Sequence, residues 1–382
     1  MSQDHYLRMI ERMNQNEMKH PPTQAMQNVL KELFTEEQAA LIGDFPLGAY
    51  SAQGLAEKLG REGGELKKML EQMSADGLIF EAKGESGEPE YSVLAFEPGL
   101  VELQFLKGKD DERTKKFVRM FNQVHEEETA LLEGLLEQPE VVREIFKVPG
   151  GRIIAIEENV SADKEIASWE RLSEIIENET SYAVGECGCK HIAKLNGEPC
   201  KTDAPSECCV WFGKVADYLV ERDYAKRYTK EELYKLMKEC EDAGLVHFTS
   251  NRTVTDNIVM CNCCKCCCLY LRINKRIREA AGVQLTETTN FLARVDEETC
   301  TGCGDCVELC SLEAIELSGE TVSINEEFCV GCGACVSTCP TESLSLVRVS
   351  RKKPPEPVSY THLRAHETRA FISNAVFCLK IV

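Results

Sequence analysis

The cysteines of this chain are confined to its second half. The chain has 382 residues and 21 cysteines, and none of them lies before Cys187. Twenty lie between Cys187 and Cys339, and Cys378 lies in a short C-terminal tail. Dense disulfide frameworks are typical of small secreted domains, whereas this chain is long and its first ten residues lack the apolar segment of a signal peptide. We therefore expect a cytoplasmic chain whose reduced thiols bind metal.

The strongest pattern is an internal repeat near the C-terminus. Residues 300–317 and 329–346 align with a period of 29 residues, and nine of the eighteen positions are identical. Each copy carries the spacing C-x2-C-x2-C-x3-C. Two short strands are predicted between the runs, at residues 314–317 and 321–324. A zinc ion takes four ligands, so eight cysteines in two matching runs favour iron–sulfur clusters over zinc.

This repeat resembles the bacterial type of two-[4Fe–4S] ferredoxin over residues 291–349. In that family the fourth cysteine of each run binds the cluster of the other run. The resemblance therefore implies two [4Fe–4S] clusters. The expected ligands of the first cluster are Cys300, Cys303, Cys306 and Cys339. The expected ligands of the second cluster are Cys329, Cys332, Cys335 and Cys310.

A second set of cysteines lies upstream of the repeat. A natural first quartet of ligands is Cys187, Cys189, Cys200 and Cys208. Six more thiols follow within eight residues, namely Cys261, Cys263, Cys264, Cys266, Cys267 and Cys268. This crowding indicates one or two further iron–sulfur clusters, with zinc and reduced structural thiols as the alternatives. Which of the six thiols bind metal stays open, because six candidates exceed four ligand positions.

Other residues of this part of the chain are predicted to serve the core. Thr229 and Glu232 form a capping box that opens a helix, and Cys240 lies on the apolar face of that helix. We therefore expect Cys240 to be a core residue. His191 is expected on the surface, and His247 is expected to serve packing.

The upstream cysteines also resemble the middle part of a family of multi-cluster proteins with a 4Fe-4S dicluster domain from anaerobic microbes. The matching stretches are residues 187–190 (CGCK), 205–213 (PSECCVWFG), 241–251 (EDAGLVHFTSN) and 261–268 (CNCCKCCC). The resemblance covers about residues 25–349. Cys209 stands where an aliphatic residue is expected, so it is left out of the ligands.

Residues 25–98 are predicted to form three helices and a hairpin, and they resemble a winged helix. An amphipathic helix is expected over residues 27–42, and Ser51 is expected to cap another at residues 52–59. Winged helices often bind DNA through the third helix. Here six Lys and Arg face fourteen Asp and Glu. Because phosphate neutralisation supplies most of the affinity for DNA, this charge favours a structural or protein-docking role.

The C-terminal tail does not belong to the natural fold. Residues 358–368 (VSYTHLRAHET) resemble one reading frame of a transposon adapter used in sequencing libraries. Residues 372–380 resemble the other end of the same adapter. We therefore expect residues 358–382 to be an adapter-derived artefact and exclude them from the fold.

The fold expected from these patterns is an α+β multidomain chain. Its parts are a winged-helix-like domain (25–98), a helical connector (99–150), a helical Cys-rich middle domain (151–290) and a dicluster ferredoxin fold (291–349). The connector is expected to carry one long helix over residues 111–138. No stretch approaches the length of a membrane span.

The function expected from these patterns is electron transfer between partner oxidoreductases. The chain lacks a phosphate loop, a dinucleotide fingerprint and a nucleophile–base pair, so we expect a redox component rather than a self-sufficient enzyme. The net charge of −20 suits docking to basic redox partners and argues against binding nucleic acid. The alternatives are an iron–sulfur-sensing transcriptional regulator and an oxidoreductase with an open-coordinated cluster.

Overall fold

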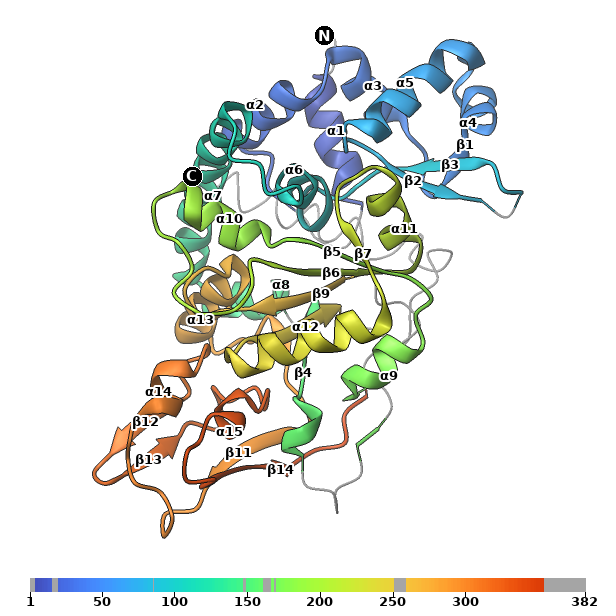
Figure 1. Cartoon of the computed structure of the whole chain (residues 1–382). Helices are drawn as coiled ribbons and strands as arrows, with labels where there is room; N and C mark the ends of the chain where they lie inside the picture. The colour runs from blue at the N-terminus through green and yellow to red at the C-terminus, as the bar shows by residue number, and fades with distance from the viewer. Residues whose placement is uncertain are drawn as a thin grey trace.

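The computed structural model describes residues 4–15, 20–84, 86–146, 149–160, 166–167, 170–250 and 259–353. These residues build three regions that follow one another in the chain and in space (Figure 1). Helices and a small sheet lie at one end, a seven-stranded sheet lies in the middle, and the cysteine repeat lies at the other end. The adapter-like residues 358–382 lie outside the described part of the chain. Within that part, no helix is both long and apolar enough to cross a membrane.

The N-terminal region combines helices with a small antiparallel sheet. Its elements are α1 (His5–Met13), α2 (Gln24–Leu33), α3 (Glu36–Asp44), β1 (Tyr50–Ser51), α4 (Ala52–Leu59), α5 (Gly63–Ala75), β2 (Phe80–Lys83) and β3 (Pro89–Ser92). The strand order is β1-β3-β2, so the hairpin of β2 and β3 pairs with the short strand β1. Leu55, Leu70 and Tyr91 are buried in the core that the helices share with the hairpin. Ser51 caps α4 as predicted, since its hydroxyl accepts a hydrogen bond from the N–H of Gly54.

The single helix predicted over residues 27–42 is wrong, because the chain breaks there into α2 and α3. Phe34 is extended between the two helices, with φ −121° and ψ 140°. Thr35 then caps α3, since its hydroxyl accepts a hydrogen bond from Gln38 N–H while the Gln38 side chain accepts one from Thr35 N–H. The apolar spacing continues across this capping box, which is why periodicity alone missed the break.

A helical connector joins the N-terminal region to the middle sheet. Its elements are η1 (Phe96–Leu100), α6 (Val101–Phe105), α7 (Glu112–Leu136) and α8 (Pro139–Ile145). Helix α7 lies within the predicted residues 111–138. Its side chains Phe117, Phe121 and Val124 are buried in the same core as α2. The long helix thus fixes the connector onto the N-terminal region.

The middle region, which we expected to be helical, is built on a seven-stranded sheet. Its elements are β4 (Gly151–Ile154), η2 (Glu157–Asn159), α9 (Leu172–Glu177), β5 (Tyr182–Glu186), α10 (Gly188–Leu195), β6 (Glu207–Phe212), α11 (Gly213–Glu221), β7 (Lys226–Tyr228), α12 (Lys230–Asp242), β8 (Val246–Ser250), β9 (Val259–Cys263), α13 (Leu269–Ala281) and β10 (Thr286–Glu287). The strand order is β10-β4-β8-β9-β6-β5-β7, and the β10–β4 pair is parallel. Helix α12 begins at the predicted capping box of Thr229 and Glu232 and lies across one face of the sheet (Figure 1).

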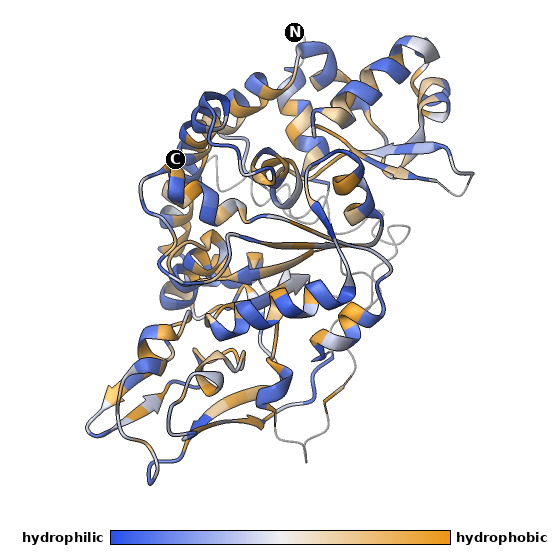
Figure 2. Ribbon diagram, viewed as in Figure 1, coloured by the Kyte–Doolittle hydropathy of each residue, from blue (hydrophilic) through white to orange (hydrophobic). Residues whose placement is uncertain are grey.

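The helical prediction failed because cysteines hide the strand pattern. Side chains alternate between the two faces of a strand. In β6, Cys208 and Val210 pack in the core beneath α12, whereas Cys209 and Trp211 pack with α6 and α11 on the other face. Because Cys208 was taken as a metal ligand, the sequence did not reveal a strand that is buried on both sides. Figure 2 shows apolar strands enclosed by helices whose outer faces are hydrophilic.

The cysteine repeat forms two similar halves around short strands. Its elements are β11 (Phe291–Val295), α14 (Asp305–Leu309), β12 (Ile315–Ser318), β13 (Thr321–Ile324), α15 (Ala334–Ser337) and β14 (Leu344–Arg348). Strands β11 and β14 pair antiparallel, and β12 and β13 form a hairpin. This hairpin confirms the two strands predicted between the cysteine runs. A short helix begins next to the third cysteine of each run, so the two halves have matching order.

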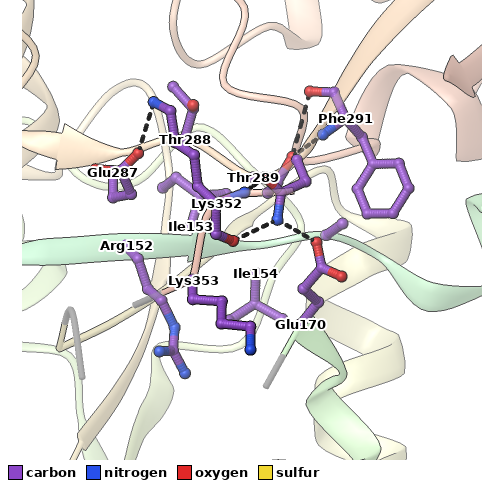
Figure 3. Close-up of a pocket in the computed structure, with 12 residues that line it drawn as sticks. Arg152, Ile153, Ile154, Glu170, Glu287, Thr288, Thr289, Phe291, Lys352 and Lys353 are labelled. Carbon is purple, nitrogen blue, oxygen red and sulfur yellow. Dashed lines mark hydrogen bonds and ion pairs between the residues drawn. The ribbon is translucent and has the colours of Figure 1, made fainter. Parts of the chain in front are cut away.

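A polar joint fastens the repeat to the middle sheet. Directly after β4, the N–H of Ile156 donates to the carbonyl of Cys332 at 2.9 Å. Arg348 Nη2 lies 2.7 Å from Glu170 Oε2, and the two side chains are 16% and 4% exposed. Figure 3 shows the pocket at this joint, which Glu170, Arg152 of β4 and Phe291 of β11 line. The contacts place the second cysteine run against the sheet.

We expect Glu170→Ala to lower the free energy of unfolding by about 3 kcal/mol, because it removes a buried carboxylate that pairs with the half-buried guanidinium of Arg348 and accepts a hydrogen bond from Asn290. The measurement is urea unfolding of the full chain without oxygen. The control is Glu239→Ala, which removes one side of an exposed ion pair and should cost less than about 0.5 kcal/mol. Equal effects of the two substitutions would contradict a stabilising role for the joint.

Candidate metal centres

Glycine lets the two cysteine runs fold back onto neighbouring backbone. Gly302, Gly304, Gly331 and Gly333 have φ between 63° and 88°, a region that favours glycine. A Cβ on Gly331 would lie 2.1 Å from the carbonyl oxygen of Phe291. The second run therefore lies directly on β11, with no room for a side chain at this position.

The first interlocked set of the repeat lies at its exposed side. Cys303 is the exposed one among the described cysteines. Burial raises the pKa of Cys306, and the charges of Cys303, Cys339 and Cys300 raise it further. The hydroxyl of Thr321 and the N–H of Gly302 lower the pKa of Cys300. The four predicted ligands of the first cluster are thus neighbours, with hydrogen-bond donors beside the sulfurs.

The second interlocked set lines a cavity inside the repeat. The thiols of Cys310, Cys329, Cys332 and Cys335 line this cavity together. Ala314 N–H donates to Cys310 Sγ at 3.3 Å. Burial raises the pKa of Cys332 to about 12. Four thiols around one cavity are the donor set that a four-thiolate cluster requires, so the residues fit such a group.

The middle sheet covers this second set. Cys310 and Cys332 pack against a buried cluster that includes Cys263 and Cys268 of the middle region. A Cβ on Gly244, which follows α12, would lie 2.3 Å from Leu309 Cδ1 of α14. The second set is therefore enclosed between the repeat and the middle region.

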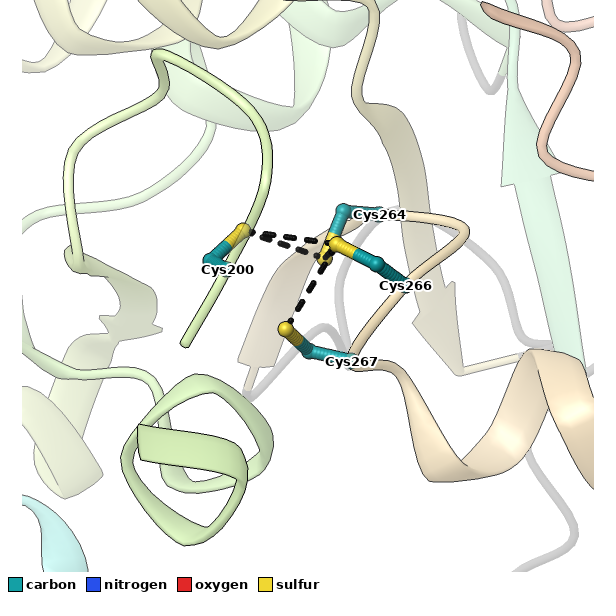
Figure 4. Close-up of side chains that lie close together, drawn as sticks. All are labelled: Cys200, Cys264, Cys266 and Cys267. Carbon is teal, nitrogen blue, oxygen red and sulfur yellow. Dashed lines mark hydrogen bonds between the residues drawn. The ribbon is translucent and has the colours of Figure 1, made fainter. Parts of the chain in front are cut away.

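Cys200 does not join the other members of its predicted quartet. It lies in the loop between α10 and β6, which reaches the turn between β9 and α13 (Figure 4). Its Sγ atom lies 3.7 Å from the Sγ atoms of Cys264 and Cys266, and Cys266 Sγ lies 3.6 Å from Cys267 Sγ. The four sulfurs all lie within 4.8 Å of one another. These four residues are termed the Cys200 group. Sequence spacing missed it, because pairing of β6 with β9 joins distant parts of the chain.

The other members of the quartet join cysteines of the later run. Cys187 interacts with Cys189 and Cys208 through its side chain, and Cys189 interacts with Cys268. Cys263 continues the series, with side-chain interactions to Cys268 and Cys261. We term this series the thiol row. In spatial order it consists of Cys208, Cys187, Cys189, Cys268, Cys263 and Cys261.

Two helix N-termini point at the thiol row. Cys187 is the N-cap residue of α10, and Cys268 is the N-cap residue of α13. Cys268 Sγ accepts a hydrogen bond from Leu271 N–H at 3.5 Å. Hydrogen bonding with Cys189 lowers the pKa of both Cys187 and Cys268. Because the N-terminus of a helix favours negative charge, both positions favour a thiolate over a thiol.

Lys190 supplies positive charge between the row and the Cys200 group. It is buried, and its Nζ donates to the carbonyl of Pro205 at 2.9 Å. Burial works to lower the pKa of Lys190, but the charges of nearby thiols, above all Cys208 and Cys200, raise it above its usual range. Sequence reasoning did not assign this role, although Lys190 directly follows Cys189.

The remaining cysteine and histidine side chains have structural partners. Cys240 is fully buried in the core beneath α12, as predicted. The expected surface position of His191 is wrong, because its side chain is buried and its Nε2 lies 2.9 Å from Asp110 Oδ1. His247 is buried, and its Nδ1 lies 2.7 Å from Asn262 Oδ1.

Two carboxyl side chains of the connector approach the thiol row. Loss of hydration raises the pKa of Glu97 to about 8, and the charge of Glu102 adds to the effect. Burial also raises the pKa of Glu102, and the charge of Cys187 contributes. Neither residue was identified from the sequence, because both lie in a segment without cysteines.

Comparison with known proteins finds one matching domain. Residues 293–346 match the family described as the 4Fe-4S dicluster domain. Neither the comparison with curated proteins nor the comparison with solved structures found a match. The chain is therefore a mixed α/β protein that carries a 4Fe-4S dicluster domain at its C-terminal end. The match supports the binding of iron–sulfur clusters by this domain.

We expect Gly331→Ala to disrupt the second cysteine run, because the added Cβ overlaps the backbone of β11. Iron content and the thermal midpoint of the anaerobically purified protein should both fall. Gly319→Ala is the matched control, since Gly319 also has positive φ (65°) but a Cβ there would meet nothing within 4 Å. Equal losses in the two variants would show that strain at positive φ, rather than the contact with Phe291, is responsible.

We expect Glu97→Gln to reduce the dependence of stability on pH. The pKa of Glu97 is raised from 4.5 to about 8 in the folded chain. Between these values the folded state binds more protons than the unfolded state, so the free energy of unfolding falls as pH rises. Urea unfolding at several pH values measures this. The free energy of unfolding of the variant, relative to that of the wild type, should increase from about pH 5 to about pH 8. If the difference in free energy of unfolding between the variant and the wild type stays constant with pH, the raised pKa of Glu97 is contradicted.

Proposed function

We propose that this chain transfers single electrons between partner oxidoreductases through iron–sulfur clusters. The observation that carries the proposal is a shared buried cluster, which contains Cys263 and Cys268 and against which Cys310 and Cys332 pack. A cluster held by the second set of the repeat would border the same buried cluster as part of the thiol row. Such closeness is what electron transfer between buried centres needs.

Two clusters are assigned to the dicluster domain. The first would be held by Cys300, Cys303, Cys306 and Cys339, and the second by Cys329, Cys332, Cys335 and Cys310. The exchange of the fourth cysteine between runs is the rule for this spacing. When bound, each cluster supplies one-electron redox chemistry, with a potential tuned by hydrogen bonds to its sulfurs. The protein supplies polar neighbours of this kind, such as Ala314 N–H at Cys310 and the Thr341 hydroxyl beside Cys339.

A third iron–sulfur centre is assigned to the thiol row, with Cys187, Cys189, Cys263 and Cys268 as ligands. These four cysteines follow one another in the row, in the order Cys187, Cys189, Cys268 and Cys263. They lie at two helix N-termini and close to Lys190, which offset the negative charge of a thiolate-bound cluster. Cys208 and Cys261 end the row and act as neighbours of the ligands.

The direction of access follows from burial. Cys303 of the first set is exposed, whereas the second set lies against the middle sheet. A redox partner would therefore exchange electrons at the first cluster, and the second would relay them to the thiol row. The net charge of −20 favours a partner with a basic docking surface.

The N-terminal region is assigned as a winged-helix domain with a structural or docking role. Its helices and its β1-β3-β2 sheet have the element order of that fold. The end of α5 is fixed to the middle region, since the hydroxyl of Tyr218 donates to the carbonyls of Ser74 and Ile79 at 3.0 and 3.2 Å. An acidic surface and a fixed third helix both disfavour the alternative role as a DNA-binding sensor.

The test is anaerobic purification of the full chain with iron and sulfide counting. We expect about twelve irons per chain, from three four-iron centres. Replacing Cys187 and Cys189 together by Ala should remove about four irons and leave the eight irons of the dicluster domain in place. Cys240→Ala, which changes a buried core thiol, should leave the count unchanged. About eight irons in the wild type would contradict the third centre.

A further inference from the structure

We propose that the Cys200 group binds one zinc ion in a tetrahedral site of four thiolates. The ligands are Cys200, Cys264, Cys266 and Cys267. The site is separate from the three clusters proposed above and does not depend on them. It would stabilise the fold rather than carry electrons, because zinc has no redox chemistry in proteins.

The sulfur–sulfur distances carry this proposal. A zinc–thiolate bond is about 2.3 Å long, so two ligands of a regular tetrahedron lie about 3.8 Å apart. The measured distances are 3.7 Å for Cys200–Cys264, for Cys200–Cys266 and for Cys264–Cys266, and 3.6 Å for Cys266–Cys267. The two remaining pairs lie within 4.8 Å. The four sulfurs therefore already surround a space that suits one metal ion.

The same distances disfavour the other uses of four thiols. A disulfide needs sulfurs about 2.05 Å apart, and all four measured pairs are much longer. In a [4Fe–4S] cluster each thiolate binds a different iron and points outward, so its sulfurs lie farther apart than around one ion. The eight cysteines of the repeat, all of them described, form no such close group. The chain thus contains two kinds of cysteine set, one open and one compact.

Polar groups lie beside two of the four sulfurs of the group. The hydroxyl of Thr202 lies 3.2 Å from Cys200 Sγ, and Lys201 N–H donates to Cys266 Sγ at 3.4 Å. The buried Lys190 places positive charge near Cys200 and Cys264. A zinc site of four thiolates carries two net negative charges, which these donors and Lys190 partly offset.

The site joins two segments that are far apart in the chain. Cys200 belongs to the loop after α10, and the other three ligands belong to the turn before α13. Helix α10 begins beside Cys187, and α13 begins beside Cys268, so each helix begins at one of the ligands proposed for the thiol row. Zinc would hold the two helix N-termini in place. Lys265, in the same turn, donates to the carbonyl of Glu308 in α14 at 3.2 Å, which links the site to the dicluster domain.

The first test uses the wild-type full chain, purified without oxygen. We expect about one zinc per chain by mass spectrometry, and four sulfur neighbours at about 2.3 Å by X-ray absorption at the zinc edge. This measurement needs no variant, so it does not depend on the folding of one. Absence of zinc, or nitrogen and oxygen neighbours in place of sulfur, overturns the proposal.

The second test assigns the ligands. Cys264→Ser and Cys266→Ser should each lower the zinc content at least about fivefold after dialysis against a chelator, with iron unchanged. Cys240→Ala is the control and should keep its zinc. Unchanged zinc in both variants overturns the proposal, and so does loss of about four irons, which would identify a cluster. Failure of the electron-transfer proposal would look different, because iron would be missing from a wild type that retains zinc.

Discussion

The structure depends on how a protein interior accommodates many thiols that must give up their protons to bind metal. Burial alone opposes this, as it raises the pKa of Cys332 and Cys264 to about 12. The chain counters it with local donors and positive charge: backbone N–H groups at the runs of the repeat, helix N-termini at Cys187 and Cys268, and the buried Lys190. Metal affinity then depends on these neighbours as much as on the sulfurs, because metal binding and proton release are linked.

The seven-stranded sheet positions three of the four sets of thiols. The sheet covers the second set of the dicluster domain. Its strand β9 carries part of the thiol row and leads into the turn that holds most of the Cys200 group. The side chains of β6 explain how one strand serves both sides, since Cys208 and Cys209 face opposite cores. The dicluster domain is therefore joined to the middle region by packing and by the Glu170–Arg348 ion pair, and not by a linker alone.

Sequence predicted the features whose ligands or caps lie close together in the chain. The repeat, its hairpin, the caps at Ser51 and Thr229 and the core position of Cys240 all follow from local spacing. The middle sheet was missed because its neighbouring strands β6 and β9 contain cysteines in place of apolar residues. The pairing of Cys200 with Cys264 could not be predicted, because it depends on which strands lie side by side. Glu97 and Lys190 were missed for the same reason, since their importance comes from spatial neighbours.

The central claim is that the second cluster of the dicluster domain and the centre in the thiol row lie close enough to exchange electrons. Pulsed electron paramagnetic resonance on the fully reduced wild type measures this most directly, because two paramagnetic centres in near contact split and broaden each other's signals. We expect a broadened spectrum that sharpens when Cys187 and Cys189 are replaced by Ala, as the dicluster signals lose a neighbour. A wild-type spectrum that is already the sum of two dicluster signals, unchanged by that substitution, would contradict the claim.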